Sequence, residues 1–426
     1  MSDPARPALL FLVERFPPDL GGVARSAHRT AAAIAQLGWD VHVVAWTRTV
    51  DAGGMVTEQQ DHGVFVHRVG LFSNWDYSMQ HSLNVLEWLH EEREFTAVWG
   101  HYLFPAGYLA VLFARMQSLP CTVSARGNDI DRLMFPPGDF SRLHWTLEHA
   151  DLVTCVSAEL QRKINVLVPA EKARVLVLGN VVDSETFQRT TDTAVLAELR
   201  GRWQIESDEV VLGFCGELRH KKGLPFLLTA LAEIRTQHSA CLLVIGAVRP
   251  RERAQLTTFA AEHPEAAERI LVTGHLEEPG DVAQALSLCD IVLQPSVWDG
   301  MPNSVLEAMA CGCLVIGSDA GGIPEIIDHG QTGFLVPRSR LNHLATAVHE
   351  VLTLSRQHRR QIGQQAADSV RTHFHADRES RRLADVMRQL GVPAARLSQA
   401  SGATPADDLP APVGPPCPRD DDSNSS

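Results

Sequence analysis

The chain has 426 residues, of which 45% are hydrophobic and 21% are charged, and its formal net charge is −13. These values are ordinary for a soluble globular protein of two or three domains. The acidic balance excludes a general nucleic-acid binder, because affinity for DNA or RNA depends on neutralising phosphates. Eight cysteines without a Cys-x-x-Cys pair do not indicate a disulfide framework, so we expect a reduced, cytoplasmic protein. No signal peptide is expected, and the longest nearly apolar stretch, 102–114, is too short to cross a bilayer.

The first half of the chain alternates apolar runs with stretches of helical periodicity. Leu9–Val13 predicts a buried strand, and apolar residues at helical spacing predict a helix that opens at Gly21-Gly22 and closes at Gly38. Continuous apolar runs of this kind are typical of a parallel sheet covered on both faces. The same patterns predict strands at Val41–Ala45, Val64–Val69, Ala97–Trp99, Cys121–Ser124, Leu152–Val156 and Val175–Leu178, and helices at Ser82–Glu92, Ala106–Arg115 and Phe140–His149.

A second series begins after the polar segment 183–207. It predicts a helix at Leu224–Arg235 and strands at Val210–Phe214, Cys241–Ile245, Ile270–Val272, Ile291–Leu293 and Leu314–Ile316. The expected fold class is therefore α/β, with two doubly wound, Rossmann-like domains facing a cleft. We place the domains at 1–185 and 186–372, followed by a C-terminal helix over 373–395 that packs back on the N-terminal domain. The proline-rich, acidic tail 396–426 is expected to be disordered, and its Asp420–Asp422 run to be a solvated charge run rather than a metal site.

Two glycine-containing loops are candidate anion sites. Gly21 and Gly22 precede the first helix, where the backbone can approach an anion closely and free N–H groups favour negative charge. The alternative is a tight turn without a ligand, since the Gly-x-Gly-x-x-Gly spacing is missing. The second loop, Gly216–Gly223, contains Arg219, Lys222 and two further basic residues. This cluster would neutralise a diphosphate, and the alternative is a solvated loop.

The segment Ser296–Glu307 follows a predicted strand and is the most informative. Asp299 would lie on the loop and Glu307 in the helix, with Pro302 at the first helical position. Carboxylates accept hydrogen bonds from sugar or ribose hydroxyls, and the backbone N–H groups between the two acids would face the same ligand. The alternative is a helix cap and a surface acid.

These residues form an ordered series with several other short motifs. The others are Pro17-Pro18, His101-Tyr102 with Pro105-Ala106-Gly107, Asn180-Val181-Val182-Asp183 with Phe187, Gly321-Gly322-Ile323-Pro324-Glu325, and Gly330 with Gly333-Phe334-Leu335-Val336. Over residues 8–390 the series resembles the retaining glycosyltransferases of family 4, which have the B-type glycosyltransferase fold.

The resemblance implies transfer of a hexosyl group from a nucleotide-diphosphate sugar to an acceptor hydroxyl, with retention and without a metal or other cofactor. Glu307 would bind the ribose, Asp299 the donor sugar, and Lys222 with Arg219 the diphosphate, stabilising the leaving charge. The partners would be a nucleotide sugar and a glycan, lipid-linked or small-molecule acceptor, and peripheral contact with the inner face of the membrane is compatible with the chain. The remaining donor-binding residues implied are Gly21, Gly22, Gly216, Gly300, Met301, Pro302, Asn303 and Ser304.

Three positions depart from the family pattern. Asp299 replaces a glutamate, which puts the donor choice in doubt, and Glu217 stands where arginine is usual. Arg126 stands where histidine is usual, in the segment Arg126–Asp129, and it cannot act as a neutral base. Arg126 would grip an anionic acceptor or a donor phosphate; the alternative is a structural arginine paired with Asp129 or Asp131.

The acceptor side is less well marked. His101 ends a predicted strand and Asp129 follows another, so both would face the acceptor, although a lone histidine is more often structural. Trp75, Tyr77 and Met79 indicate either ordinary packing or an acceptor loop or membrane-touching edge. Two rival functions share the fold: a nucleotide-sugar 2-epimerase or glycosyl-phosphate lyase, and a non-catalytic nucleotide-sugar-binding partner.

Overall fold

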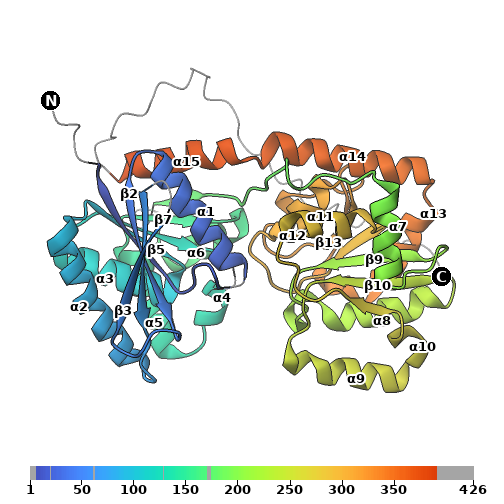
Figure 1. The fold of residues 1–426 in the computed structure, drawn as a ribbon, viewed down its shortest axis with the longest axis horizontal. Helices are drawn as coiled ribbons and strands as arrows, with labels where there is room; N and C mark the ends of the chain where they lie inside the picture. Colours follow the sequence, from blue (N-terminus) through green and yellow to red (C-terminus); the bar gives the residue numbers. More distant parts are fainter. Residues whose placement is uncertain (1–5, 20, 61–62, 128, 170–173, 391–426) are drawn as a thin grey trace, which may run out of the picture.

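The molecule consists of two α/β lobes that lie side by side (Figure 1). The computed structural model describes residues 6–19, 21–60, 63–127, 129–169 and 174–390. The tail expected over 396–426, and residues 391–395 of the expected C-terminal helix, lie outside the described residues.

An eight-stranded sheet forms the centre of the N-terminal lobe, in the order β3-β4-β2-β1-β5-β6-β7-β8. Neighbouring strands are parallel except β3, which pairs antiparallel with β4. The strand order reverses between β1 and β5, where loops from the two halves of the sheet diverge. The strands are β1 Ala8–Val13, β2 Asp40–Thr47, β3 Met55–Gln60, β4 Val64–Gly70, β5 Ala97–His101, β6 Cys121–Ala125, β7 Leu152–Cys155 and β8 Val175–Val177.

Helices cover both faces of this sheet because its central strands are apolar on both sides. In β1, Leu9, Phe11 and Val13 pack in one buried cluster, whereas Leu10 and Leu12 point into another on the opposite face. The helices of this lobe are α1 Gly22–Gln36, α2 Trp75–Arg93, α3 Tyr108–Gln117, α4 Asp129–Leu133, α5 Pro137–His149 and α6 Ala158–Leu167, with a helical turn at Leu103–Gly107.

The C-terminal lobe has a six-stranded parallel sheet in the order β11-β10-β9-β12-β13-β14. Its strand order reverses between β9 and β12. The strands are β9 Val210–Cys215, β10 Ala240–Ile245, β11 Ile270–Val272, β12 Ile291–Gln294, β13 Leu314–Ser318 and β14 Phe334–Val336. The helices are α7 Thr193–Arg202, α8 Leu224–Arg235, α9 Arg253–Glu262, α10 Pro264–Ala267, α11 Pro279–Ser287, α12 Asn303–Ala310 and α13 Leu344–Thr353, and shorter turns span His220–Lys222, Pro250–Glu252, Ile323–Glu325 and Arg338–His343.

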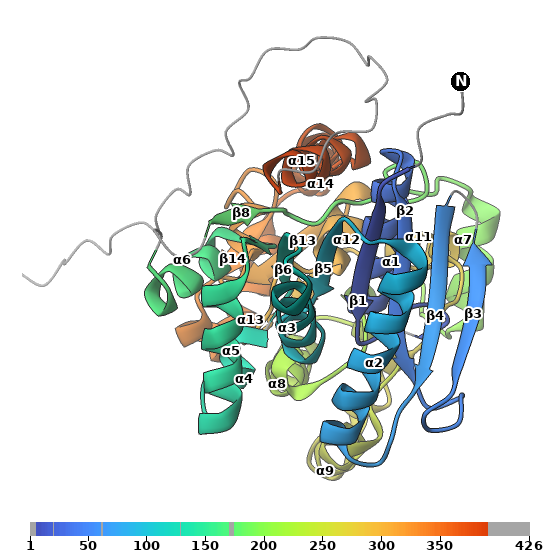
Figure 2. The ribbon, with the colours of Figure 1, turned by 90° about the vertical axis from the view of Figure 1, so that its left-hand side faces the viewer.

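Two final helices run along both lobes. Helix α14 (Arg356–His373) lies on the C-terminal lobe and α15 (Ala376–Gln389) lies on the N-terminal lobe (Figure 1). Turned by 90°, the two helices are seen almost end-on, one behind the other (Figure 2). Leu383, Val386 and Met387 of α15 are buried in the cluster that contains Leu9 and Phe11 of β1. The chain therefore crosses between the lobes twice, once before α7 and once between α14 and α15.

The expected α/β class with two doubly wound sheets is confirmed, with three local corrections. Strands β3 and β14 were not predicted from the sequence. Helix α2 begins at Trp75 rather than Ser82, because Asn74 caps its N-terminus through a hydrogen bond from the Asp76 N–H to its side chain. Trp75, Tyr77 and Met79, for which the sequence indicates either ordinary packing or an acceptor loop or membrane-touching edge, therefore lie in the first turns of a helix, where Trp75 and Tyr77 are exposed. Among the described helices, none is both long and apolar enough to cross a membrane.

Candidate active site

The loops after β9 and β12 meet where the strand order of the C-terminal sheet reverses. In open α/β sheets, ligands bind outside the carboxyl ends of the strands at such a reversal. The β9 loop contains Gly216, Arg219 and Lys222, and the β12 loop contains Asp299. The two predicted donor segments are thus brought together by the sheet.

Lys222 and Asp299 contact each other directly. The Lys222 ammonium donates to Asp299 Oδ2, which also accepts from the Ser296 hydroxyl at 3.2 Å, and Asp299 Oδ1 accepts from the Gly300 N–H at 3.0 Å. The Ser296 hydroxyl in turn accepts from the Gln294 amide at 3.0 Å. Asp299 was expected to contact donor hydroxyls, whereas here both of its oxygens have protein partners. A donor sugar would therefore compete with Lys222 for this carboxylate.

Glu217 lies between two arginines. It pairs with Arg219, and its Oε1 accepts from Arg249 Nε at 3.0 Å. The two guanidinium groups lower the pKa of Glu217 against the opposing effect of burial. Lys221 lies in the same cluster, where burial and the neighbouring Lys222 lower its pKa to about 8. Arg219, expected to bind the diphosphate with Lys222, is thus paired in the free protein with Glu217, the acid at the position where arginine is usual.

Glu307 reaches across to the other lobe. Its side chain is 8% exposed, and its Oε1 lies 3.7 Å from Arg25 Nη1 on α1. Burial raises the pKa of Glu307, and the charges of Arg25 and Arg29 oppose this shift. Burial, and after it the charge of Glu307, raise the pKa of Cys215 at the end of β9. The charges of Arg25 and Lys222 oppose this rise. Glu307 Oε2 lies 4.0 Å from Cys215 Sγ, so Glu307 and its partner Arg25 lie beside the carboxyl end of β9.

The start of α1 faces this point. Gly21 has φ of 125°, which favours glycine, and it precedes the first helical residue, Gly22. Because Arg25, one turn later, forms an ion pair with Glu307 of α12, the helix start and α12 lie on opposite sides of the same junction. Helix α12 begins at Asn303, so Pro302 is its N-cap residue and not its first helical residue. Met301 and Pro302 are buried, and Asn303 and Ser304 are half-buried.

Arg126 lies where the β12 loop meets the N-terminal lobe. Its Nη2 donates to Asn180 Oδ1 at 2.8 Å, and Asn180 Nδ2 donates to the Met301 carbonyl at 2.6 Å. Gly300 is required here, because a Cβ on it would lie 2.7 Å from the Arg126 carbonyl oxygen and 2.8 Å from Gly127 Cα. Burial, followed by the charge of Arg29, lowers the pKa of Arg126 to about 10.

The alternative pairing of Arg126 with Asp129 or Asp131 is wrong. The buried Asp129 carboxylate accepts the backbone N–H groups of Arg126 and Gly127, each at 3.1 Å. Asp131 instead pairs with Lys163 at 2.9 Å. Asp129 therefore shapes the loop that carries Arg126 and does not neutralise its side chain.

His101 is fully buried at the end of β5. Its Nε2 lies 3.0 Å from the Ser26 hydroxyl, whereas its Nδ1 has no partner. Burial holds the pKa of His101 well below its usual range, and the charges of Arg126 and Arg29 lower it further. The imidazole is thus neutral at physiological pH and lies close to two guanidinium groups.

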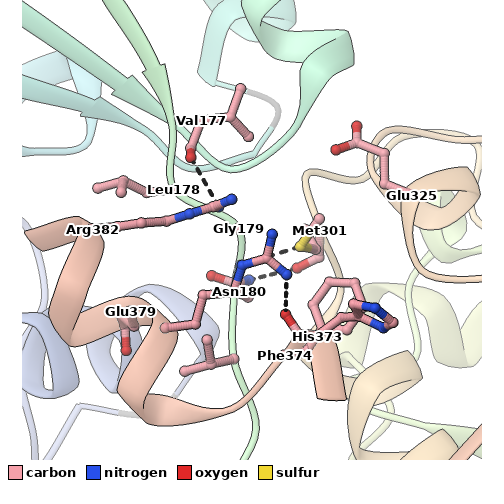
Figure 3. Close-up of a pocket in the computed structure, with 12 residues that line it drawn as sticks. Val177, Leu178, Gly179, Asn180, Met301, Glu325, His373, Phe374, Glu379 and Arg382 are labelled. Atoms are coloured by element: carbon pink, nitrogen blue, oxygen red, sulfur yellow. Dashed lines mark hydrogen bonds between the residues drawn. The ribbon is translucent and has the colours of Figure 1, made fainter. Parts of the chain in front are cut away.

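A pocket marks the place where the chain crosses between the lobes (Figure 3). Asn180 and Met301 meet on one side, and Arg382 of α15 donates to the Val177 carbonyl at 3.2 Å on the other. Glu325 comes from the C-terminal lobe, and its Oε1 accepts the Ala158 N–H at 2.7 Å, at the first residue of α6. Glu325 therefore caps a helix of the opposite lobe.

Sequence reasoning missed several side chains at this junction. Arg25 and Arg29 come from α1, Arg249 follows β10, and Glu379 of α15 accepts from Arg29 Nε at 2.7 Å. The signal for the first two was available, since they lie four residues apart, on one helix face, directly after Gly21-Gly22. Within the described residues no group of three or more histidine, cysteine or acidic side chains is arranged to hold a metal ion.

Comparisons with known proteins identify the family. Residues 209–354 match the glycosyl transferases group 1 family and residues 21–180 match the glycosyl transferase 4-like domain. N-acetyl-alpha-D-glucosaminyl L-malate synthase of Bacillus anthracis is 26% identical over 363 residues, which are 85% of this chain and 92% of that protein. GDP-mannose-dependent alpha-(1-6)-phosphatidylinositol monomannoside mannosyltransferase of Mycobacterium tuberculosis is 28% identical over 305 residues, or 70% of this chain and 77% of that protein.

Solved structures show the same fold. A sucrose-phosphate synthase from Thermosynechococcus elongatus superposes with a TM-score of 0.77 at 18% identity, covering 91% of this chain and 99% of that one. HepE of Anabaena in complex with UDP gives a TM-score of 0.73 at 18% identity, covering 89% and 99%. The fold is thus the B-type glycosyltransferase fold, and with both halves matched in order, the chain belongs to the group 1 glycosyl transferases of family 4 and is a hexosyltransferase.

Proposed function

We propose that this glycosyltransferase moves a hexosyl group, with retention, from a nucleotide-diphosphate sugar on the C-terminal lobe to an acceptor hydroxyl on the N-terminal lobe. One observation carries the proposal: Glu307 lies 4.0 Å from Cys215 at the end of β9 and 3.7 Å from Arg25 of the opposite lobe, and the loop that follows β9 brings Lys222 to Asp299 of the neighbouring β12 loop. The acceptors named for the two relatives, L-malate and a phosphatidylinositol monomannoside, differ from each other. Neither is therefore transferred to this chain.

Each C-terminal residue has a role in holding the donor. Glu307 is a buried acceptor for the ribose hydroxyls, and Lys222 with Arg219 supplies charge to the diphosphate. Arg249 adds a third cation through its contact with Glu217. Donor binding replaces the Lys222–Asp299 contact and the Arg25–Glu307 contact, so it opens a junction that these pairs close in the free enzyme.

The reaction follows from this arrangement. The bond between the anomeric carbon and the phosphate oxygen breaks, and its electron pair stays on the nucleoside diphosphate, where Lys222 stabilises the developing charge. The acceptor oxygen then bonds to the anomeric carbon from the same face, and its proton passes to the leaving phosphate. This route retains the configuration and needs no protein nucleophile.

We further propose that no metal is needed and that the enzyme works in the cytoplasm, with contact to the membrane limited to its surface. Three cations close to the diphosphate position support the first point. The seven cysteines between Cys121 and Cys313 are buried free thiols, which fits a reducing compartment. The first point is tested by measuring activity in excess EDTA, where we expect it to persist. The second is tested by sedimentation with lipid vesicles, which shows whether the protein pellets with them or stays in the supernatant.

A donor panel tests the proposed function. UDP-glucose, UDP-N-acetylglucosamine and GDP-mannose are incubated with mixed acceptors, and the released nucleoside diphosphate and the anomeric configuration of the product are measured. We expect the nucleoside diphosphate to be released from one donor, and the product to keep the axial anomeric configuration of that donor, which shows retention. We expect the transfer rate to fall strongly in Glu307→Ala. The exposed variant Arg371→Ala on α14 is the matched control and keeps its rate. Interconversion of donors without acceptor would instead identify an epimerase.

A further inference from the structure

Three nitrogen-bearing side chains converge on the N-terminal side of the junction. Arg29 comes from α1, His101 ends β5, and Arg126 follows the neighbouring strand β6. His101 is shielded from solvent, yet its Nδ1 has no hydrogen-bond partner, and the Nη2 atom of Arg29 is likewise buried without one. Buried polar atoms without partners are uncommon, because leaving one unpaired costs free energy. Two of them in one cluster mark it as a place that can bind a polar group.

Arg29 is paired with Glu379, whereas the charge of Arg126 is not matched by a direct carboxylate contact. The guanidinium of Arg126 bonds to the neutral side-chain amide of Asn180. Two carboxylates, Glu379 and Asp129, lie close enough for their charges to raise the pKa of Arg126. Glu379 bonds to Arg29, and Asp129 accepts from backbone N–H groups. Neither contacts the Arg126 guanidinium. Arg29 and Arg126 are also close enough that the charge of Arg29 lowers the pKa of Arg126, after burial.

The cluster adjoins the place where sugar transfer would occur. Arg126 is joined through Asn180 to Met301, and its backbone touches Gly300, so it borders the loop that carries Asp299. Arg29 lies one helical turn after Arg25, which contacts Glu307, so both arginines are on the face of α1 that is turned to the cleft. The donor diphosphate already has three cations of the C-terminal lobe close to its position. Arg126 bonds to Asn180 and Arg29 to Glu379, apart from that set, so these two cations are available to a different group.

We propose that the acceptor carries a carboxylate or phosphate beside the hydroxyl that receives the sugar, and that Arg126, together with Arg29 and His101, binds this anion. Such a group offers only acceptor oxygens, and these match the guanidinium fork of Arg126 and the free Nη2 of Arg29. His101 supplies a third donor in its Nδ1–H tautomer, in which the Ser26 hydroxyl donates to His101 Nε2 instead of to the Val23 carbonyl, 3.0 Å away. That the bound anion belongs to the sugar acceptor rests on the proposed function. The existence of the anion site does not depend on turnover.

Matched acceptor pairs test the proposal in the full-length enzyme. Glucose 6-phosphate is compared with glucose, and glycerate with glycerol, using the donor that the panel selects. We expect the anionic member of a pair to be used with at least 10-fold higher kcat/KM. In Arg126→Met the KM for the anionic acceptor rises roughly 10- to 100-fold, the range that loss of a hydrogen bond to a charged group gives, and the KM for the donor changes less than two-fold. Arg126→Lys keeps the charge without the fork and gives an intermediate KM.

The other source of the anion is the donor diphosphate itself. If the KM for the donor rises in Arg126→Met while the KM for the acceptor stays constant, Arg126 binds the donor and the proposal is overturned. Equal use of neutral and anionic acceptors also overturns it. The control is Arg142→Met on α5, whose guanidinium lies over the Phe104 ring and which leaves both KM values unchanged.

A binding measurement separates this proposal from the proposed function. Malonate or inorganic phosphate is titrated in a thermal-shift experiment without any donor, because a ligand that binds only the folded state raises its stability. Stabilisation of the wild type that is lost in Arg126→Met and partly kept in Arg126→Lys supports the anion site, even if no donor in the panel is turned over. Equal stabilisation of all three proteins overturns the anion site, even if sugar transfer is confirmed.

Discussion

The two faces of the junction treat their cations differently. On the C-terminal face, Lys222 is paired with Asp299, and Arg219 and Arg249 share Glu217. On the N-terminal face, the guanidinium of Arg126 has an uncharged partner and the neutral imidazole beside it has an unpaired nitrogen. The C-terminal face thus pairs these three cations with carboxylates, whereas on the N-terminal face Arg126, unlike Arg25 and Arg29, has no direct carboxylate contact.

This difference predicts how each face would recognise its ligand. A diphosphate entering the C-terminal face must displace carboxylates, so binding there exchanges one set of ion pairs for another and is selective for a strongly charged group. A single anion entering the N-terminal face displaces no carboxylate from Arg126. In the proposed assignment, the donor site is therefore closed by ion pairs before binding, and the anion site of the acceptor is preorganised.

The largest expected effect comes from removing the central cation of the C-terminal face. Lys222→Ala leaves Asp299 without its partner and removes the charge that stabilises the departing diphosphate. We expect kcat/KM for sugar transfer to fall by about 10²- to 10³-fold, as for other preorganised donors to a developing charge. Steady-state kinetics with the selected donor measure the loss. A rate within three-fold of the wild type would remove Lys222 from the site.

The stability of the N-terminal lobe should depend on pH through a buried pair of histidines. His42 and His67 are buried in the N-terminal lobe with His42 Nδ1 3.0 Å from His67 Nε2, and burial lowers the pKa of both to about 4. A histidine with a depressed pKa stabilises the fold above pH 6.5 and loses that contribution as the pH falls toward 4. We expect the free energy of unfolding to fall by roughly 2–3 kcal/mol between pH 7 and pH 5.

Urea unfolding at both pH values measures this loss. The variant His42→Phe, which keeps a ring near Phe65 and Phe95, should be less stable at pH 7 but less sensitive to acid. The same pH dependence in the variant and the wild type would show that the histidine pair is not its source.

Releasing the arginines of the C-terminal face should strengthen donor binding. Glu217→Gln removes the carboxylate that holds Arg219 and Arg249, so both become available to the diphosphate. We expect the Kd for UDP or GDP to fall by about 3- to 10-fold, equivalent to roughly 1 kcal/mol, since the pairs are only partly buried. Isothermal titration calorimetry measures the change. Weaker binding would mean that Glu217 orients the arginines rather than competing for them.

The smallest effect concerns the contact that joins the two faces. Glu325→Ala removes the acceptor for the Ala158 N–H, and loss of a helix cap costs about 1 kcal/mol. Chemical denaturation measures the difference. The exposed variant Glu277→Ala should change the free energy of unfolding by less than about 0.5 kcal/mol. Equal values for both variants would show that the lobes do not depend on this cap.

Much of the fold could be predicted because its central strands are continuous apolar runs. Strand β3 was missed because Thr57, Glu58 and Gln59 make it a polar edge strand, and β14 because three residues carry little periodicity. The candidate loops were found from their glycines and charges. Their partners were not, because the contacts of Glu307 with Arg25 and of Arg126 with Asn180 depend on how two lobes meet, which local patterns do not encode.

The most direct measurement is a crystal structure of the enzyme with UDP or GDP bound. The account predicts that a diphosphate oxygen takes the place of Asp299 beside the Lys222 ammonium, that the ribose hydroxyls bond to Glu307, and that Arg126 does not touch the nucleotide. A nucleotide bound away from the carboxyl ends of β9 and β12, with the Lys222–Asp299 contact intact, would contradict it.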